Sequence, residues 1–134
     1  MHELVERIQQ PQLCYVFAKN AIRNGHPELA VQAYRRAVDL RAEAHDVDSE
    51  VDLDALRAIY AYEEALSFNK GKRTRATGTW QMVNKNGLVP AIHRRLQSGS
   101  TRDVMPALQE LGMEDYSFEA LARRHPDAFQ QAAA

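Results

Sequence analysis

Apolar residues recur at every third or fourth position along most of this chain, and no stretch alternates apolar and polar residues like a half-buried strand. Gly and Pro stand between the apolar segments, where they favour turns and helix ends. The pattern predicts an all-α fold, a compact bundle of about six to eight short helices. The expected helices span residues 3–10, 12–24, 27–45, 53–68, 90–97, 103–111 and 115–124, with a further helix capped by Thr77 or Thr79 and ending near Asn86. A short turn is expected after Asp127.

The length of 134 residues fits one domain with its own core. We expect a single helical domain over 1–134, with a helical hairpin at 1–45, an acidic linker at 46–54 and a basic helical subregion at 55–126. The single cysteine, Cys14, lies in an apolar run and is expected to be buried. No apolar run is long enough to cross a bilayer and the first residues lack a signal-peptide pattern, so no membrane association and a cytoplasmic location are expected.

The segment from Pro11 to Ala44 carries small and aromatic residues at spaced positions. It resembles one tetratricopeptide repeat, a pair of antiparallel helices of about 34 residues. The matching positions are Phe17, Ala18, Gly25, Ala30, Tyr34 and Ala37. Cys14 and Ala42 depart from the pattern, which often has Trp and Pro there, and no second copy follows. The resemblance therefore implies a single helical hairpin, because a peptide-binding solenoid needs about three repeats.

Acidic residues occupy every second position from Asp46 to Asp54. Their spacing is similar to the start of a calcium-binding loop, but Val51 stands where the sharp turn needs Gly and Arg57 where the ligand is Glu. We expect no metal site and no cofactor. Ser49 and Asp52 instead form a capping pattern for the following helix. The acidic segment could also pair with basic residues of the same chain or of a second copy.

The stretch from Ala65 to Arg102 contains 38 residues with eight Lys or Arg and no Asp or Glu, although the whole chain has 17 basic and 18 acidic residues. Surfaces of one sign attract partners of the other sign. The residues expected to bind nucleic acid or another anion are Lys70, Lys72, Arg73, Arg75, Lys85, Arg94 and Arg95. Residues 70–78 are expected to form an exposed, flexible loop, and Glu64 is expected to pair with Lys70 or Arg73.

Residues 79–96 resemble a DNA-binding helix-turn-helix, with Gly87 at the end of the first helix and a turn at Leu88 and Val89. Pro90 is expected to begin the second helix. Trp80 has two interpretations. Its helical spacing favours a core position, and the alternative is stacking on an unpaired base.

The sequence contains no nucleophile motif, phosphate-binding Gly loop or His and Cys spacing for a metal, so we expect a non-enzymatic protein. The nearest group of catalytic residue types is Tyr60 and Tyr62 with Glu63 and Glu64, the last two expected on the wetter side of their helix. The first hypothesis is a nucleic-acid-binding or regulatory protein. The alternative is a protein-interaction module, an adaptor or a homodimer, whose basic face docks an acidic partner.

Overall fold

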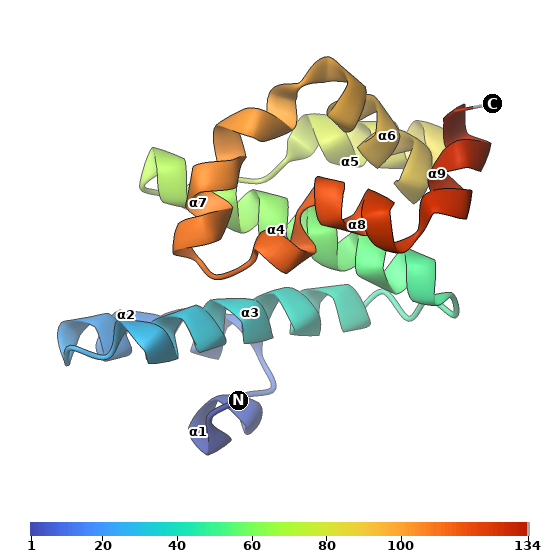
Figure 1. Ribbon diagram of the computed structural model, residues 1–134. Coiled ribbons are helices and arrows are strands. Elements are labelled where there is room, and N and C mark those ends of the chain that lie inside the picture. The colour runs from blue at the N-terminus through green and yellow to red at the C-terminus, as the bar shows by residue number, and fades with distance from the viewer. Residues whose placement is uncertain (134) are drawn as a thin grey trace. The chain divides into compact units, whose positions relative to one another are not determined.

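The computed structural model describes residues 1–133, and these form nine α-helices, two 3₁₀ helices and no strand (Figure 1), which confirms the all-α prediction. The elements are α1 (Glu3–Glu6), α2 (Pro11–Arg23), α3 (Pro27–Glu43), α4 (Glu50–Lys70), α5 (Thr77–Asn86), α6 (Leu88–Ser98), η1 (Ser100–Val104), α7 (Met105–Glu110), η2 (Glu114–Tyr116), α8 (Phe118–Arg124) and α9 (Pro126–Ala133). The helix count rises above the expected range because the residues after Pro126, expected to form one turn, form α9.

The chain divides into two compact units, Met1–Asp46 and the residues from Val47 onward. The division falls next to the expected end of the hairpin subregion at residue 45. The seven basic residues expected to bind an anion all belong to the second unit.

The first unit is built around the α2–α3 hairpin. Gly25 adopts a left-handed φ of 81°, and the N–H of His26 donates to the carbonyl of Ala21 at 2.8 Å, which closes the end of α2 as a Schellman motif. Pro27 then occupies the first turn of α3. The buried core between the two helices consists of Cys14, Ala18, Ala21, Ala30, Ala33 and Ala37. These small side chains let the two backbones approach closely.

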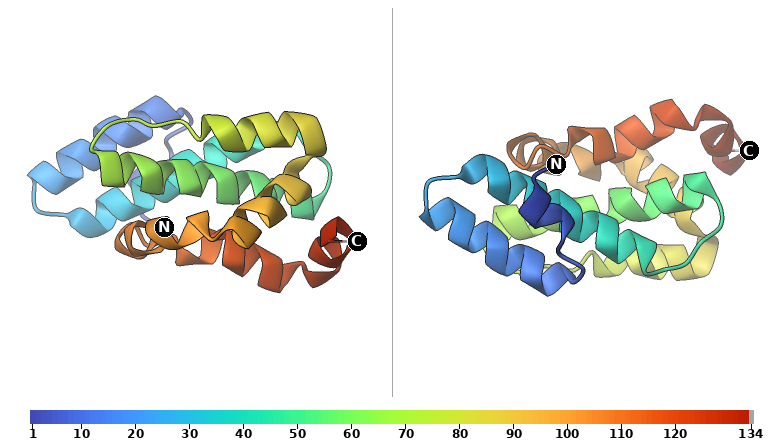
Figure 2. Two further views of the ribbon diagram at one scale, coloured as in Figure 1. Left: turned by 90° about the horizontal axis from the view of Figure 1, so that it is seen from above. Right: turned by 90° about the horizontal axis from the view of Figure 1, so that it is seen from below.

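The second unit is organised around α4, which contacts α6, α7, α8 and both 3₁₀ helices. In the left view of Figure 2, α4 runs through the middle of this unit, with α5 on one side and α7 and α8 on the other. Ala55, Leu56, Ala58, Ile59 and Ala61 are all buried on it. A helix buried around most of its circumference needs such small and aliphatic residues on several faces rather than on one stripe.

Helix α4 begins at Glu50, so the last five positions of the expected acidic linker belong to the helix. The Ser49 hydroxyl accepts from the N–H of Asp52 at 3.0 Å, which confirms the capping interaction. Asp54 faces inward and is only 14% exposed. Its carboxylate lies 3.0 Å from Arg57 Nη1 and 2.8 Å from His125 Nε2, so it connects the start of α4 to the junction of α8 and α9.

Replacing Asp54 by Ala removes both contacts, and we expect the free energy of unfolding to fall by about 1–3 kcal/mol. The measurement is urea unfolding followed by the fluorescence of Trp80, the single tryptophan of the chain. Asp48→Ala, at an exposed position before the helix, is the control and should change stability by less than about 0.5 kcal/mol. Equal effects of the two substitutions would show that the Asp54 contacts contribute little.

Candidate functional site

The predicted anion-binding residues lie on three consecutive elements. Lys70 ends α4, while Lys72, Arg73 and Arg75 lie on residues 71–76, the basic loop, between α4 and α5. Lys85 is on α5, and Arg94 and Arg95 are on α6. Six of these seven side chains are exposed and Arg95 is half-buried.

The basic loop is held against α4 at several points, in contrast to the flexible loop expected from its composition. Gly71 reverses the chain after α4 with a left-handed φ of 71°. The Ser67 hydroxyl accepts from the N–H of Thr74 at 2.9 Å and donates to the carbonyl of Glu63 at 2.8 Å. Glu63 Oε2 accepts from the N–H of Ala76 at 2.8 Å. The loop therefore presents its basic side chains from a fixed backbone.

Arg73 forms a two-pronged ion pair with Glu64, which confirms one of the two expected pairings. Its Nη1 and Nη2 atoms lie 2.6 and 2.9 Å from the two carboxylate oxygens. The expectation that Glu64 lies on the wetter side of α4 is wrong, because its side chain is only 3% exposed. A carboxylate this buried is costly unless paired, so Arg73 first neutralises Glu64. The Arg73 side chain as a whole is still 52% exposed.

Trp80 is a core residue of the second unit. It is 9% exposed, and its Nε1–H donates to Glu63 Oε2 at 2.8 Å. The Tyr60 ring centroid lies 5.1 Å from that of Trp80, and Arg75 Cζ lies 5.7 Å from the Trp80 centroid. The Trp80 ring has almost no exposed area on which a base could stack, so the core interpretation of this residue fits the structure.

Arg95 is partly engaged inside the protein. Its Nε donates to the buried Thr79 hydroxyl at 3.0 Å. A Cβ added at Gly78 would lie 2.9 Å from Arg95 Nη2, so the absence of a side chain at Gly78 makes room for the guanidinium. Arg95 thus joins α6 to α5, and less of its charge is available to an outside partner.

The junction of α5 and α6 differs from the expected helix-turn-helix. Gly87 alone separates the helices, with φ of 95° and ψ of 169°, and α6 begins at Leu88 rather than at Pro90. The first turn of α6 consists of Leu88, Val89 and Pro90, all half-buried. A recognition helix reads base edges with polar residues near its start, and the first turn of α6 offers none. The exposed basic residue of α6, Arg94, lies in its second half.

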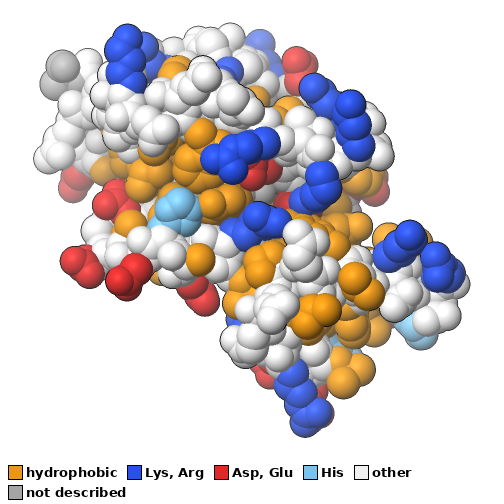
Figure 3. Space-filling view, turned by 180° about the vertical axis from the view of Figure 1, so that it is seen from behind, with side chains coloured by type: hydrophobic (Ala, Val, Ile, Leu, Met, Phe, Trp, Pro, Cys, Tyr) orange, Lys and Arg blue, Asp and Glu red, His pale blue; other side chains and the backbone are white. Residues whose placement is uncertain are grey.

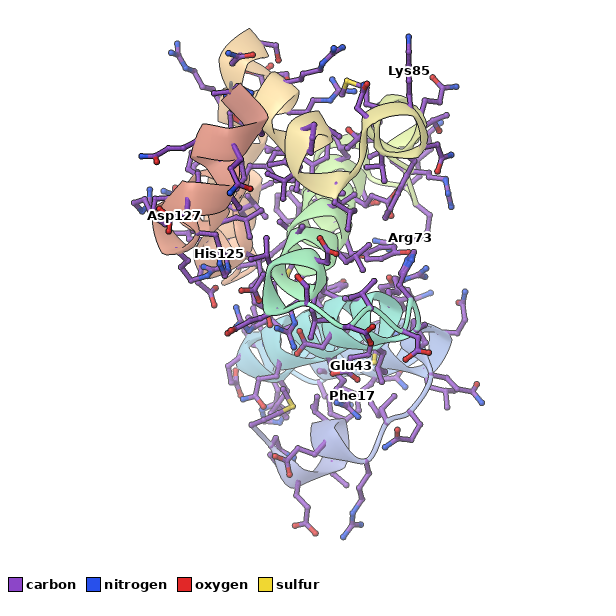
Figure 4. The ribbon with its side chains drawn as sticks, turned by 90° about the vertical axis from the view of Figure 1, so that its right-hand side faces the viewer. Phe17, Glu43, Arg73, Lys85, His125 and Asp127 are labelled. Carbon is purple, nitrogen blue, oxygen red and sulfur yellow. The ribbon has the colours of Figure 1, made fainter. Side chains whose placement is uncertain are left out.

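Lys70, Lys72, Lys85 and Arg94 remain exposed and form no ion pair within residues 1–133. In Figure 3, Lys and Arg side chains form separate small groups, with hydrophobic and uncharged side chains between them. In Figure 4, Arg73 lies beside α4, whereas Lys85 extends outward from α5 into open space.

Sequence reasoning missed two features of this site. The loop-holding roles of Glu63 and Ser67 were not expected, although their four-residue spacing places them on one face of α4. Phe68, treated only as the end of a helix, is 52% exposed in the last turn of α4.

No helix within residues 1–133 is long and apolar enough to cross a membrane. The same residues contain no group of three His, Cys, Asp or Glu side chains placed to hold a metal ion.

Because Glu64 is buried, Arg73→Ala should lower the free energy of unfolding by about 1–3 kcal/mol. The decrease should be smaller in a Glu64→Gln background, where no unpaired charge remains. Urea unfolding of the four proteins of this double-mutant cycle measures the difference. Lys72→Ala is the matched control on the same loop and should be close to neutral. An equal decrease in both backgrounds would contradict the assigned role of the ion pair.

Comparisons of the chain with protein-family models, with curated proteins and with solved structures found no match. The function of this chain therefore has to be inferred from its own residues.

Proposed function

We propose that this chain is a non-enzymatic nucleic-acid-binding protein that holds phosphate groups with basic side chains of its second unit. The residues assigned to this surface, the phosphate surface, are Lys70, Lys72, Arg75, Lys85 and Arg94. The observation that supports the proposal most is the fixed basic loop, whose three basic residues are all exposed. A fixed backbone lowers the entropy lost when its side chains bind a partner.

Two acidic residues of α4 next to the basic loop are already engaged within the protein. Glu64 is buried and paired with Arg73, and Glu63 accepts hydrogen bonds from Ala76 and Trp80. Their charges are directed toward these internal donors. Lys70, Lys72 and Arg75 are exposed next to them, and positive charge of this kind attracts the phosphate backbone.

The proposed binding is independent of base sequence. Phosphate contacts position a protein on nucleic acid without reading sequence, whereas readout needs polar side chains at base edges. The apolar first turn of α6 supplies no such side chains. The late position of Arg94 on α6 also suits phosphate better than a base edge.

Fluorescence anisotropy with labelled duplex DNA, single-stranded DNA and RNA at several salt concentrations tests the proposal. We expect an affinity that falls with salt, with a slope of about −0.9 per phosphate contacted on duplex DNA. Lys70→Ala with Lys72→Ala should weaken binding and reduce the slope by about one for each phosphate that is no longer bound. Arg73 is left unchanged, because its substitution would also disturb Glu64.

The matched control removes the same charge from the first unit, as Lys19→Ala with Arg23→Ala, both exposed on α2. This control should keep the affinity and slope of the original protein. Absence of binding to all three nucleic acids at low salt would overturn the proposal. Equal decreases in affinity for the two double variants would show that binding depends only on the net charge of the protein. The binding site could then not be assigned to the phosphate surface.

A second candidate function is self-association through opposite charges. Asp46, Asp48 and Glu50 are exposed, so the acidic segment offers carboxylates to the basic loop of another copy. A dimer of this kind should dissociate as salt rises, because salt screens exposed charges. Size-exclusion chromatography with light scattering at low and high salt measures this. A mass that stays monomeric at both concentrations would exclude the dimer and leave nucleic acid, or a separate acidic protein, as the partner.

A further inference from the structure

Phe68 is a large apolar side chain exposed near the C-terminal end of α4. It is 52% exposed in the last turn of α4, two residues before Lys70. The other large hydrophobic side chains with comparable exposure, such as Leu13, Val16 and Ile22, belong to the first unit. Covering exposed apolar area of this kind is favourable, so Phe68 is a candidate contact for a ligand.

The position of Phe68 on α4 places it next to the basic loop. It follows Glu64 by four residues, and side chains at this spacing are neighbours on one helix face, with Cβ atoms about 5–6 Å apart. Glu64 is the residue that binds Arg73, and Ser67, directly before Phe68, binds the N–H of Thr74. Phe68 therefore lies on the face of α4 on which Glu64 binds Arg73.

An exposed aromatic ring among basic side chains matches the chemistry of single-stranded nucleic acid. Proteins that bind single strands without sequence preference use basic side chains along the backbone and aromatic rings on which bases stack. A duplex keeps its bases paired and stacked. Its phosphates can contact the basic side chains, but it has no unpaired base to stack on the ring. The phosphate surface together with Phe68 therefore distinguishes the two forms of nucleic acid.

We propose that Phe68 is a stacking platform for an unpaired base, while the basic side chains of the phosphate surface hold phosphates of the same strand, so that the protein prefers single strands to duplexes. This inference rests on the nucleic-acid-binding function proposed above. It assigns to Phe68 the stacking role that the sequence suggested for Trp80, whose ring is covered.

The test compares Phe68→Ala with the original protein on three labelled probes of equal length. The probes are oligothymidine, a duplex, and an abasic strand that keeps the phosphates but has no bases. Because stacking on one aromatic ring contributes about 1–3 kcal/mol per base, Phe68→Ala should weaken oligothymidine binding about 5- to 150-fold. Duplex and abasic binding should not change.

Two further variants separate stacking from a general effect on the fold. Phe68→Tyr keeps an aromatic ring and should retain the preference for single strands. Ile22→Ala removes a similarly exposed apolar side chain from α2 and should leave all three affinities unchanged. Circular dichroism and Trp80 fluorescence of each variant report whether the second unit is folded.

The failure of this inference differs from the failure of the proposed function. If the original protein binds the probes in a salt-dependent manner, but Phe68→Ala weakens all three equally or none, the stacking role is overturned and phosphate binding stands. If the original protein binds none of the probes at low salt, both proposals fall. Exposure of Phe68 would then point to an apolar contact with a protein partner.

Discussion

Two adjacent carboxylates of α4 hold the loop that carries Lys72 and Arg75 of this protein's proposed site. Glu64 is 3% exposed and pairs with Arg73, while Glu63 accepts from the backbone of Ala76 and from the Trp80 indole. A buried carboxylate requires such partners, because the free energy of removing its charge from water is large. The path of the chain from α4 to α5 depends on satisfying these two groups.

This arrangement divides the basic residues into two kinds. Arg73 and Arg95 have partners inside the second unit, Glu64 and Thr79 respectively. Lys70 and Lys72 have no ion-pair partner within the described chain, so their charges are available to an outside molecule. A count of charges along the sequence does not distinguish basic residues that have a partner inside the protein from those that do not. The surface that can attract an anion is therefore smaller than the acid-free stretch, but it is held in a fixed position.

The two units use different solutions to helix packing. In the hairpin, small residues such as Ala18, Ala30 and Ala37 lie at the interface, as the spacing predicted, and Cys14 is buried with them. In the second unit, α4 is buried around most of its circumference, and short helices and 3₁₀ turns cover it. A buried helix of this kind exposes mainly its ends, and the Lys70 end carries the proposed site.

The sequence alone determined the helices and most of their ends, because helical periodicity, capping by Ser49 and chain reversal at Gly25 act within a few residues. It also indicated the basic stretch, since charge is a property of composition. Tertiary structure decided which charged side chains are exposed. It also decided that Trp80 is buried and that Phe68 is exposed. These outcomes could not be predicted because burial depends on which elements pack together. Contacts such as Asp54 with His125 join residues far apart in the chain, and no local pattern encodes them.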